Sequence, residues 1–188
     1  FCADPFNITK NSKNFIFFEE LIYNENLGKI SVIEMDNNGN HTKPEVVLEN
    51  DYHLSYPFIV EDNGELYMIP ETEENRTIEL YKCIKFPSKW KLEKVLFNNL
   101  KAVDSTIIKH NGKYWLFTNL CEYKGEDVIN ELFLFYSDKL VSDTWTSHPK
   151  NPITTDHKYS RPAGSIFVHD NKLFRPAQNC SKHYGYGI

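Results

Sequence analysis

The sequence lacks the features that mark several classes of protein. Its four cysteines form no CxxC pair, so neither a zinc site nor a dense disulfide scaffold is indicated. Its basic residues are scattered and outnumbered, 21 lysines and arginines against 26 aspartates and glutamates, which excludes nucleic-acid binding through phosphate contacts. Its apolar runs fall far short of the roughly 20 residues that a membrane helix needs. We therefore expect a soluble chain with no membrane span and no nucleic-acid partner.

The seven histidines show no HxH or HxxxH spacing, so we expect no metal and no cofactor. What is present is 188 residues, 40% hydrophobic and 14% aromatic, which suffices for one core and predicts a single domain over residues 1–188. The chain opens without an initiator methionine, and we interpret it as a mature form or a piece of a longer protein. Its compartment would follow its source: cytoplasm in a bacterium, the secretory-pathway lumen in a eukaryote.

An internal repeat organises the chain. Residues 56–71 align without a gap with residues 104–119, and a third copy covers residues 163–178. A weaker copy opens the chain near residue 4. Each strong copy has a short apolar strand, a turn at Asn63-Gly64, Asn111-Gly112 or Asp170-Asn171, and a second apolar strand. Asn-Gly between such runs is a strong hairpin signal, because both turn positions need positive φ.

Further strand-like runs follow each hairpin, which gives about four strands per unit, with units beginning near residues 4, 56, 104 and 163. A four-stranded unit that recurs at this spacing is typical of a β-propeller blade. A β-sandwich does not predict copies of one hairpin, and a β-trefoil has threefold repeats. We therefore predict an all-β fold, a five-bladed β-propeller of four-stranded blades that this chain need not complete.

The repeat predicts which side chains meet. In a blade the first strand lines the central channel and the second returns beside it, so strand-one starts and strand-two ends emerge around one mouth. The strand-one starts are Asp4, Tyr56, Asp104 and Arg161, the strand-two ends are Glu20, Glu71, Asn119 and Gln178, and His53 lies near them. Carboxylates, amides and an aromatic ring around a concave mouth are the groups that bind sugars. Paired carboxylates would also suit cleavage of a glycosidic bond.

The alternative for any one of these residues is a purely structural role, since polar side chains at strand ends commonly cap backbone groups or begin turns. For the whole set the carbohydrate interpretation is favoured, because the repeat forces the residues onto one face.

Several motifs carry a resemblance to a known family. They include Ala3-Asp4-Pro5-Phe6, the run from His53 to Phe58 (HLSYPF), the run from Tyr67 to Glu71 (YMIPE) and Arg161-Pro162-Ala163-Gly164. Together they resemble the N-terminal propeller domain of glucosamine inositolphosphorylceramide transferases and of similar bacterial proteins, over nearly the whole chain. The resemblance implies a fused or associated transferase domain, which in the plant proteins is separate and C-terminal.

More distantly, the Asp-Pro opening is similar to arabinanase and β-xylosidase-type glycosidases with five blades. That analogy implies Asp4 as general base, Asp104 as an orienting carboxylate, and Glu71 or Glu20 as the acid. The sequence departs from it at Tyr56, where those enzymes have an aspartate, and in having no glutamate at the start of the later blades.

Three hypotheses follow. The first is a propeller module that recognises a glycan or sugar conjugate, with Tyr56, Arg161, His53, Asn119 and Gln178 as binding residues, in association with a sugar-modifying enzyme. The second is a glycoside hydrolase that uses the mouth carboxylates Asp4, Asp104, Glu71 and Glu20. The third is a non-catalytic propeller for protein interaction, in which the mouth residues only satisfy one another.

Overall fold

The computed structural model describes residues 1–124 and 127–188, with side chains described outside residues 121–130. This part of the chain is all-β and contains no helix. The first sheet comprises β1 (Cys2–Lys10), β2 (Lys13–Ile22), β3 (Leu27–Met35) and β4 (Glu45–Leu48). The second comprises β5 (Ser55–Asp62), β6 (Glu65–Thr72), β7 (Thr77–Lys85) and β8 (Lys89–Asn98). The third comprises β9 (Ala102–His110), β10 (Lys113–Lys124), β11 (Asp127–Ser137) and β12 (Thr146–Ser147).

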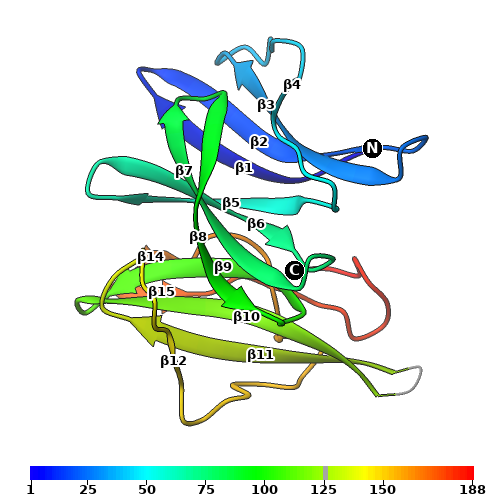
Figure 1. Ribbon diagram of the computed structural model, residues 1–188, viewed down its shortest axis with the longest axis vertical. Coiled ribbons are helices and arrows are strands. Elements are labelled where there is room, and N and C mark those ends of the chain that lie inside the picture. The colour runs from blue at the N-terminus through cyan, green and yellow to red at the C-terminus, as the bar shows by residue number, and fades with distance from the viewer. Residues whose placement is uncertain (125–126) are drawn as a thin grey trace.

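Each of these three sheets is an antiparallel meander in chain order, as predicted for a blade. The remaining strands form two short pairs, β13 (Arg161–Pro162) with β16 (Ala177–Gln178) and β14 (Phe167–His169) with β15 (Lys172–Phe174). They are the beginning of a fourth unit. Figure 1 shows the sheets following one another along the molecule in chain order. Strand β5 contacts both β1 and β9, which identifies the first strand of each sheet as the one nearest the common axis.

The hairpin turns within the sheets are the ones that the sequence predicts. Asn63 and Gly64 have φ values of 51° and 79°, and Asn111 and Gly112 have 50° and 76°. Positive φ at both turn positions matches the right-handed twist of the flanking strands. The other two hairpins keep the same geometry with Asn11-Ser12 and Asp170-Asn171. The four turns therefore share one conformation although only two of them contain glycine.

Two hydrophobic cores lie between neighbouring sheets. One joins the first and second sheets, and there Phe17 is fully buried with its ring edge-on to Trp90 at 5.7 Å between centroids. The other joins the second and third sheets, where Phe97 contacts Phe135 at 4.7 Å. The aromatic residues thus pack one blade against the next. No helix among the described residues is long and apolar enough to cross a membrane.

Candidate functional site

A bulge at the same place in each of the first three sheets positions the candidate site. In the first sheet the pairing of the first two strands shifts by one residue between Ala3 and Phe6. The second sheet has the same shift between Ser55 and Phe58. The third has it in the part of β9 that faces Phe117 to Asn119 on β10. The extra residues are Asp4, Tyr56 and Asp104, with φ values of 50°, 42° and 52°. Such conformations are strained for residues other than glycine and cluster at functional sites. In the fourth unit Gly164 has φ 110°.

A cavity of about 460 Å³ opens where these bulges meet. Asp4, Phe6 and Tyr56 line one side of it. Ala163, Gly164 and Gln178 line the other, together with Gly185, Gly187 and Ile188. Segments from opposite ends of the chain therefore enclose one space. Of the residues predicted from the sequence, Asp4, Tyr56 and Gln178 reach this cavity directly.

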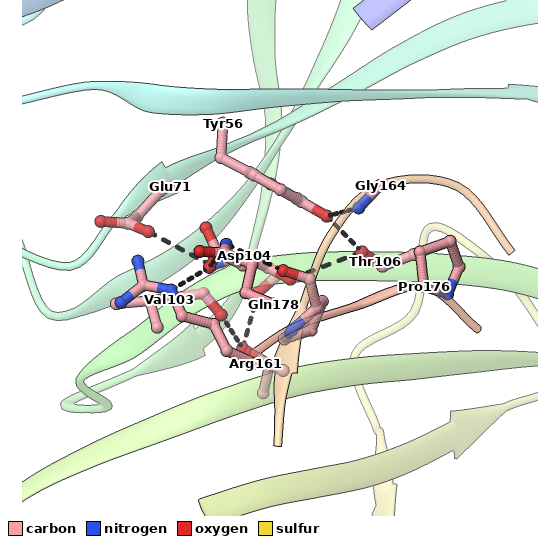
Figure 2. A network of polar contacts seen from close by, with 12 residues as sticks. Tyr56, Glu71, Val103, Asp104, Thr106, Arg161, Gly164, Pro176 and Gln178 are labelled. Atoms are coloured by element: carbon pink, nitrogen blue, oxygen red, sulfur yellow. Dashed lines mark hydrogen bonds and ion pairs between the residues drawn. The ribbon is translucent and has the colours of Figure 1, made fainter. Parts of the chain in front are cut away.

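Asp104 is the centre of a buried polar network beside the cavity (Figure 2). Its Oδ2 accepts a hydrogen bond from Arg161 Nε at 2.5 Å and another from Gln178 Nε2 at 3.1 Å. Only 2% of Asp104 is exposed, so the ion pair with Arg161 is desolvated and its loss would leave an uncompensated buried charge. Gln178 joins this network to the cavity wall.

Glu71 adds a second acid to the network. Its Oε2 accepts the backbone N–H of Asp104 at 3.2 Å. Burial, together with the charge of Asp104, raises the pKa of Glu71 to about 8. Burial also raises the pKa of Asp104, to about 6, against the opposing effect of Arg161. Near neutral pH Glu71 therefore holds a proton while Asp104 is ionised and paired with Arg161.

Tyr56 ties the second, third and fourth units together. Its hydroxyl lies 3.0 Å from Thr106 Oγ1 on β9 and accepts the backbone N–H of Gly164 at 2.7 Å (Figure 2). Only 3% of Tyr56 is exposed to solvent, and this burial raises the pKa of its hydroxyl. Tyr56 is therefore a neutral, hydrogen-bonded part of the cavity wall.

Asp4 has a different environment from Asp104. Burial and the charge of Glu19 raise its pKa, while a hydrogen bond from the backbone N–H of Tyr56 lowers it. Within the described part of the chain no lysine, arginine or histidine forms an ion pair with Asp4. Its carboxyl group lines the cavity without a salt bridge, although the nearby charge of Arg161 also lowers its pKa.

The structure places the other predicted residues outside the cavity wall. Glu20 lies on β2 and its carboxylate accepts the hydroxyl of Ser31 at 2.6 Å. His53 bridges two segments, with Nε2 3.1 Å from Glu19 Oε1 and Nδ1 accepting the backbone N–H of Gly28 at 3.1 Å. Asn119 is fully buried and lies opposite Val103 in the sheet. The side chains of Glu20 and His53 thus hold strands and connections together around the mouth.

From the sequence, Glu19 was placed only alongside the strand end Glu20, and Gly164 was not predicted as a site residue. The strand register places Glu19 opposite Ala3, as it places Glu71 opposite Ser55 and Asn119 opposite Val103. Glu19, one residue before Glu20, is therefore the structural counterpart of Glu71. Gly164 has φ 110° and donates its backbone N–H to Tyr56, and the glycine in the motif Arg161-Pro162-Ala163-Gly164 was the available signal.

Solved structures with the same arrangement are glycoside hydrolases. An exo-β-1,3-galactanase from Phanerochaete chrysosporium matches 93% of this chain and 41% of its own, with a TM-score of 0.70 and 17% identity. An α-L-arabinanase from Cellvibrio cellulosa matches 97% of this chain and 71% of its own, with a TM-score of 0.63 and 12% identity. These likenesses show the fold, a five-bladed β-propeller, of which this chain forms a part.

Sequence relatives are closer. The glucosamine inositolphosphorylceramide transferase 1 of Arabidopsis thaliana is 36% identical over 100% of this chain, and that of Oryza sativa subsp. japonica is 34% identical over 98%. The chain spans only 25% of the length of each of these relatives. The family model described as "Glucosamine inositolphosphorylceramide transferase 1, N-terminal" matches residues 1–188. The chain therefore belongs to the family of glucosamine inositolphosphorylceramide transferase N-terminal domains.

Proposed function

We propose that this propeller module binds the sugar part of a glycoconjugate in the cavity at Asp4. We propose further that it acts together with a sugar-transferring domain in the same polypeptide. The observation that supports this most strongly is the convergence of the strained bulges at Asp4, Tyr56 and Asp104 beside a cavity of about 460 Å³. A volume in this range suits a small ligand. The relatives' name supports the transferase connection.

The chemistry of the wall favours hydroxyl or ammonium groups over phosphate. Asp104 is neutralised by Arg161 and Glu71 is protonated near neutral pH, which leaves Asp4 as the acidic side chain that lines the cavity. A carboxylate accepts hydrogen bonds from vicinal hydroxyls or from the ammonium group of an amino sugar, and it repels a phosphate. The Phe6 ring, which also lines the cavity, offers an apolar surface for a sugar face.

Binding to simple probes tests the proposal. We expect isothermal titration calorimetry to detect binding of glucosamine and of a glucosaminyl-inositol headgroup to the wild-type chain, and to detect weak or no binding of inorganic phosphate. Asp4→Asn keeps the positive φ that asparagine tolerates but removes the charge. Because a hydrogen bond to a charged group contributes about 1.5–3 kcal/mol, we expect affinity to fall by about tenfold or more.

Asp170→Asn is the matched control, because Asp170 also has a positive φ, 47°, and lies in the exposed β14–β15 turn. This turn is at the end of its hairpin that points away from the cavity. It should bind like the wild type. Equal binding by Asp4→Asn and Asp170→Asn would remove the proposed site. Absence of binding to every sugar probe would leave the structural role of the mouth residues as the better hypothesis.

A second candidate function is hydrolysis of a glycosidic bond. It is favoured by one observation, a protonated acid at Glu71 beside the ionised Asp104, which is the pairing that acid catalysis uses. Against it, Glu71 and Asp104 do not line the cavity, and the fourth unit has Ala163 at the position aligned with Asp104. If the chain hydrolyses aryl-glycosides, Glu71→Gln should lower kcat by about 10²–10⁴. Hydrolysis at the wild-type rate by Glu71→Gln would rule out Glu71 as the acid.

A further inference from the structure

A closed loop near the end of the chain, drawn in red in Figure 1, forms part of the rim of the cavity. The backbone N–H of Asn179 donates to the carbonyl of Gly187 at 2.7 Å and closes the loop. Cys180 donates its backbone N–H to the carbonyl of His157 at 2.9 Å, which ties the loop to the connection between β12 and β13. Gly185 and Gly187 line the cavity. The loop is therefore fixed at its base and reaches the cavity with its second half.

Tyr184, the residue before Gly185, lies against Arg161. The Cζ atom of Arg161 is 4.9 Å from the centre of the Tyr184 ring, which is a cation–π contact. Arg161 is itself fixed, because its Nε donates to Asp104 and its backbone pairs with that of Gln178. Tyr184 is nevertheless 67% exposed. One face of the ring therefore rests on the guanidinium group while the rest of the ring is open to solvent.

The charges that act on Tyr184 place its hydroxyl close to the acids of the site. Burial raises the pKa of Tyr184 against the opposing charge of Arg161. Three carboxyl groups raise this pKa further, those of Asp104, Asp4 and Glu71. The hydroxyl is therefore protonated near neutral pH, and it can both donate and accept a hydrogen bond at the mouth.

Arg161 provides further hydrogen-bond donors beside the ring. Within the described residues its guanidinium group forms a hydrogen bond through Nε alone, with the carboxylate of Asp104. The two Nη groups remain accessible to solvent, since 19% of the side chain is exposed and neither group is fully buried. An open aromatic ring with donors at its edge suits a sugar ring, whose C–H face packs on the aromatic ring and whose hydroxyls accept hydrogen bonds.

We propose that Tyr184 and Arg161 form a second sugar subsite on the rim of the cavity, so that the ligand of this module contains at least two linked rings. The first ring occupies the cavity at Asp4, and the next ring stacks on Tyr184. This inference rests on the proposed function and adds the length of the ligand to it. Because Arg161 holds the aromatic ring in place before binding, the contact costs little ordering entropy.

A second tyrosine in the same loop provides the matched control. The Nζ atom of Lys182 lies 4.5 Å from the centre of the Tyr186 ring, and the His183 ring is 5.6 Å from it. Tyr186 is 43% exposed and is not a residue of the cavity wall. Its contacts are thus with its own loop, so its removal tests the effect of disturbing the loop alone.

Isothermal titration calorimetry with one-ring and two-ring probes tests the proposal. Glucosamine is the one-ring probe, and its β-1,4-linked dimer and the glucosaminyl-inositol headgroup are the two-ring probes. We expect a two-ring probe to bind the wild-type chain about three- to tenfold more tightly than glucosamine, which is the gain that one aromatic contact provides. Tyr184→Ala should remove this gain and leave the affinity for glucosamine within about twofold. Tyr184→Phe, which keeps the ring, should retain most of the gain, and Tyr186→Ala should retain all of it.

Three results would overturn the second subsite while glucosamine binding upholds the proposed function. The first is a wild-type chain that gains nothing from either two-ring probe. The second is a full gain retained by Tyr184→Ala. The third is a Tyr184→Ala variant that loses glucosamine as well, because the ring would then support the cavity instead of binding a further sugar. A wild-type chain that binds none of the probes would refute sugar binding at Asp4, and the second subsite with it.

Discussion

Glu71 and Asp104 show how two acids from different blades acquire opposite states in one buried place. Arg161 donates to Asp104 and keeps it ionised, whereas burial and the charge of Asp104 raise the pKa of Glu71 by more than Arg161 and the backbone N–H of Asp104 lower it. The sequence predicted that these residues lie at one end of the propeller, because equivalent strands of successive blades begin and end at the same face. It could not predict the pairing of Asp104 with Arg161, since that contact depends on how far one blade is rotated from the next.

The proton on Glu71 makes stability depend on pH. The folded chain holds this proton up to a pKa of about 8, whereas the ordinary value is 4.5. The contribution of Glu71 is therefore fully present below about pH 4.5 and is lost as the pH rises toward 8, with a slope of at most about 1.4 kcal/mol per pH unit. We expect Glu71→Gln to remove this loss, which urea unfolding at a series of pH values would measure.

The comparison is cleanest between pH 6 and 8, because the raised pKa of Asp104, about 6, produces a loss of the same sign at lower pH. His53, whose pKa is raised by Glu19, also contributes a loss in this range. Both variants retain His53, so its effect cancels in the difference between them. Parallel stability curves for wild type and Glu71→Gln from pH 6 to 8 would contradict the assignment of the proton to Glu71.

At the scale of elements, turns and bulges differ in how well the sequence predicts them. The hairpin turns follow from Asn63-Gly64 and Asn111-Gly112 because positive φ at both positions is a local requirement with a local signature. The bulges at Asp4, Tyr56 and Asp104 have no common residue type, and a bulky tyrosine is unexpected at φ 42°. Because the same bulge occurs in all three sheets, Asp4 and Glu19 are separated by as many residues as Tyr56 and Glu71, which makes Glu19 rather than Glu20 the counterpart of Glu71.

The β1–β2 turn offers a direct test of turn conformation. Ser12 has φ 60°, in a position that Gly64 and Gly112 fill in the equivalent hairpins. An L-residue in this conformation costs roughly 1–2 kcal/mol, which glycine avoids. Glycine also makes the unfolded chain more flexible, which lowers the free energy of unfolding by part of that amount. We therefore expect Ser12→Gly to stabilise the protein by up to about 1 kcal/mol. Gly64→Ser should destabilise it by a similar amount. Chemical denaturation of the two variants measures both effects, and changes of the same sign would contradict a shared turn geometry.

At the scale of the whole molecule, stability resides in the contacts between blades. The repeat predicted successive four-stranded blades of a propeller, and the two cores join each sheet to the next. Which residue of each strand faces which neighbour could not be predicted until the bulges fixed the register. The structure shows that Met68 and Leu116 occupy equivalent places, each turned toward the preceding blade.

Truncation at these equivalent positions should measure the contact between blades one at a time. Met68 and Leu116 are both fully buried, so Met68→Ala and Leu116→Ala should each cost about 2–5 kcal/mol through lost burial and the cavity left behind. Ile16 occupies the same place in the first sheet but lines an open groove. Ile16→Ala should therefore cost less than about 1 kcal/mol in the 188-residue chain. Urea unfolding of the three variants would rank the contacts by their contribution to the free energy of unfolding. An apolar side chain contributes fully only where another surface excludes water from it. An equal cost at Ile16 would therefore mean that its face is already covered.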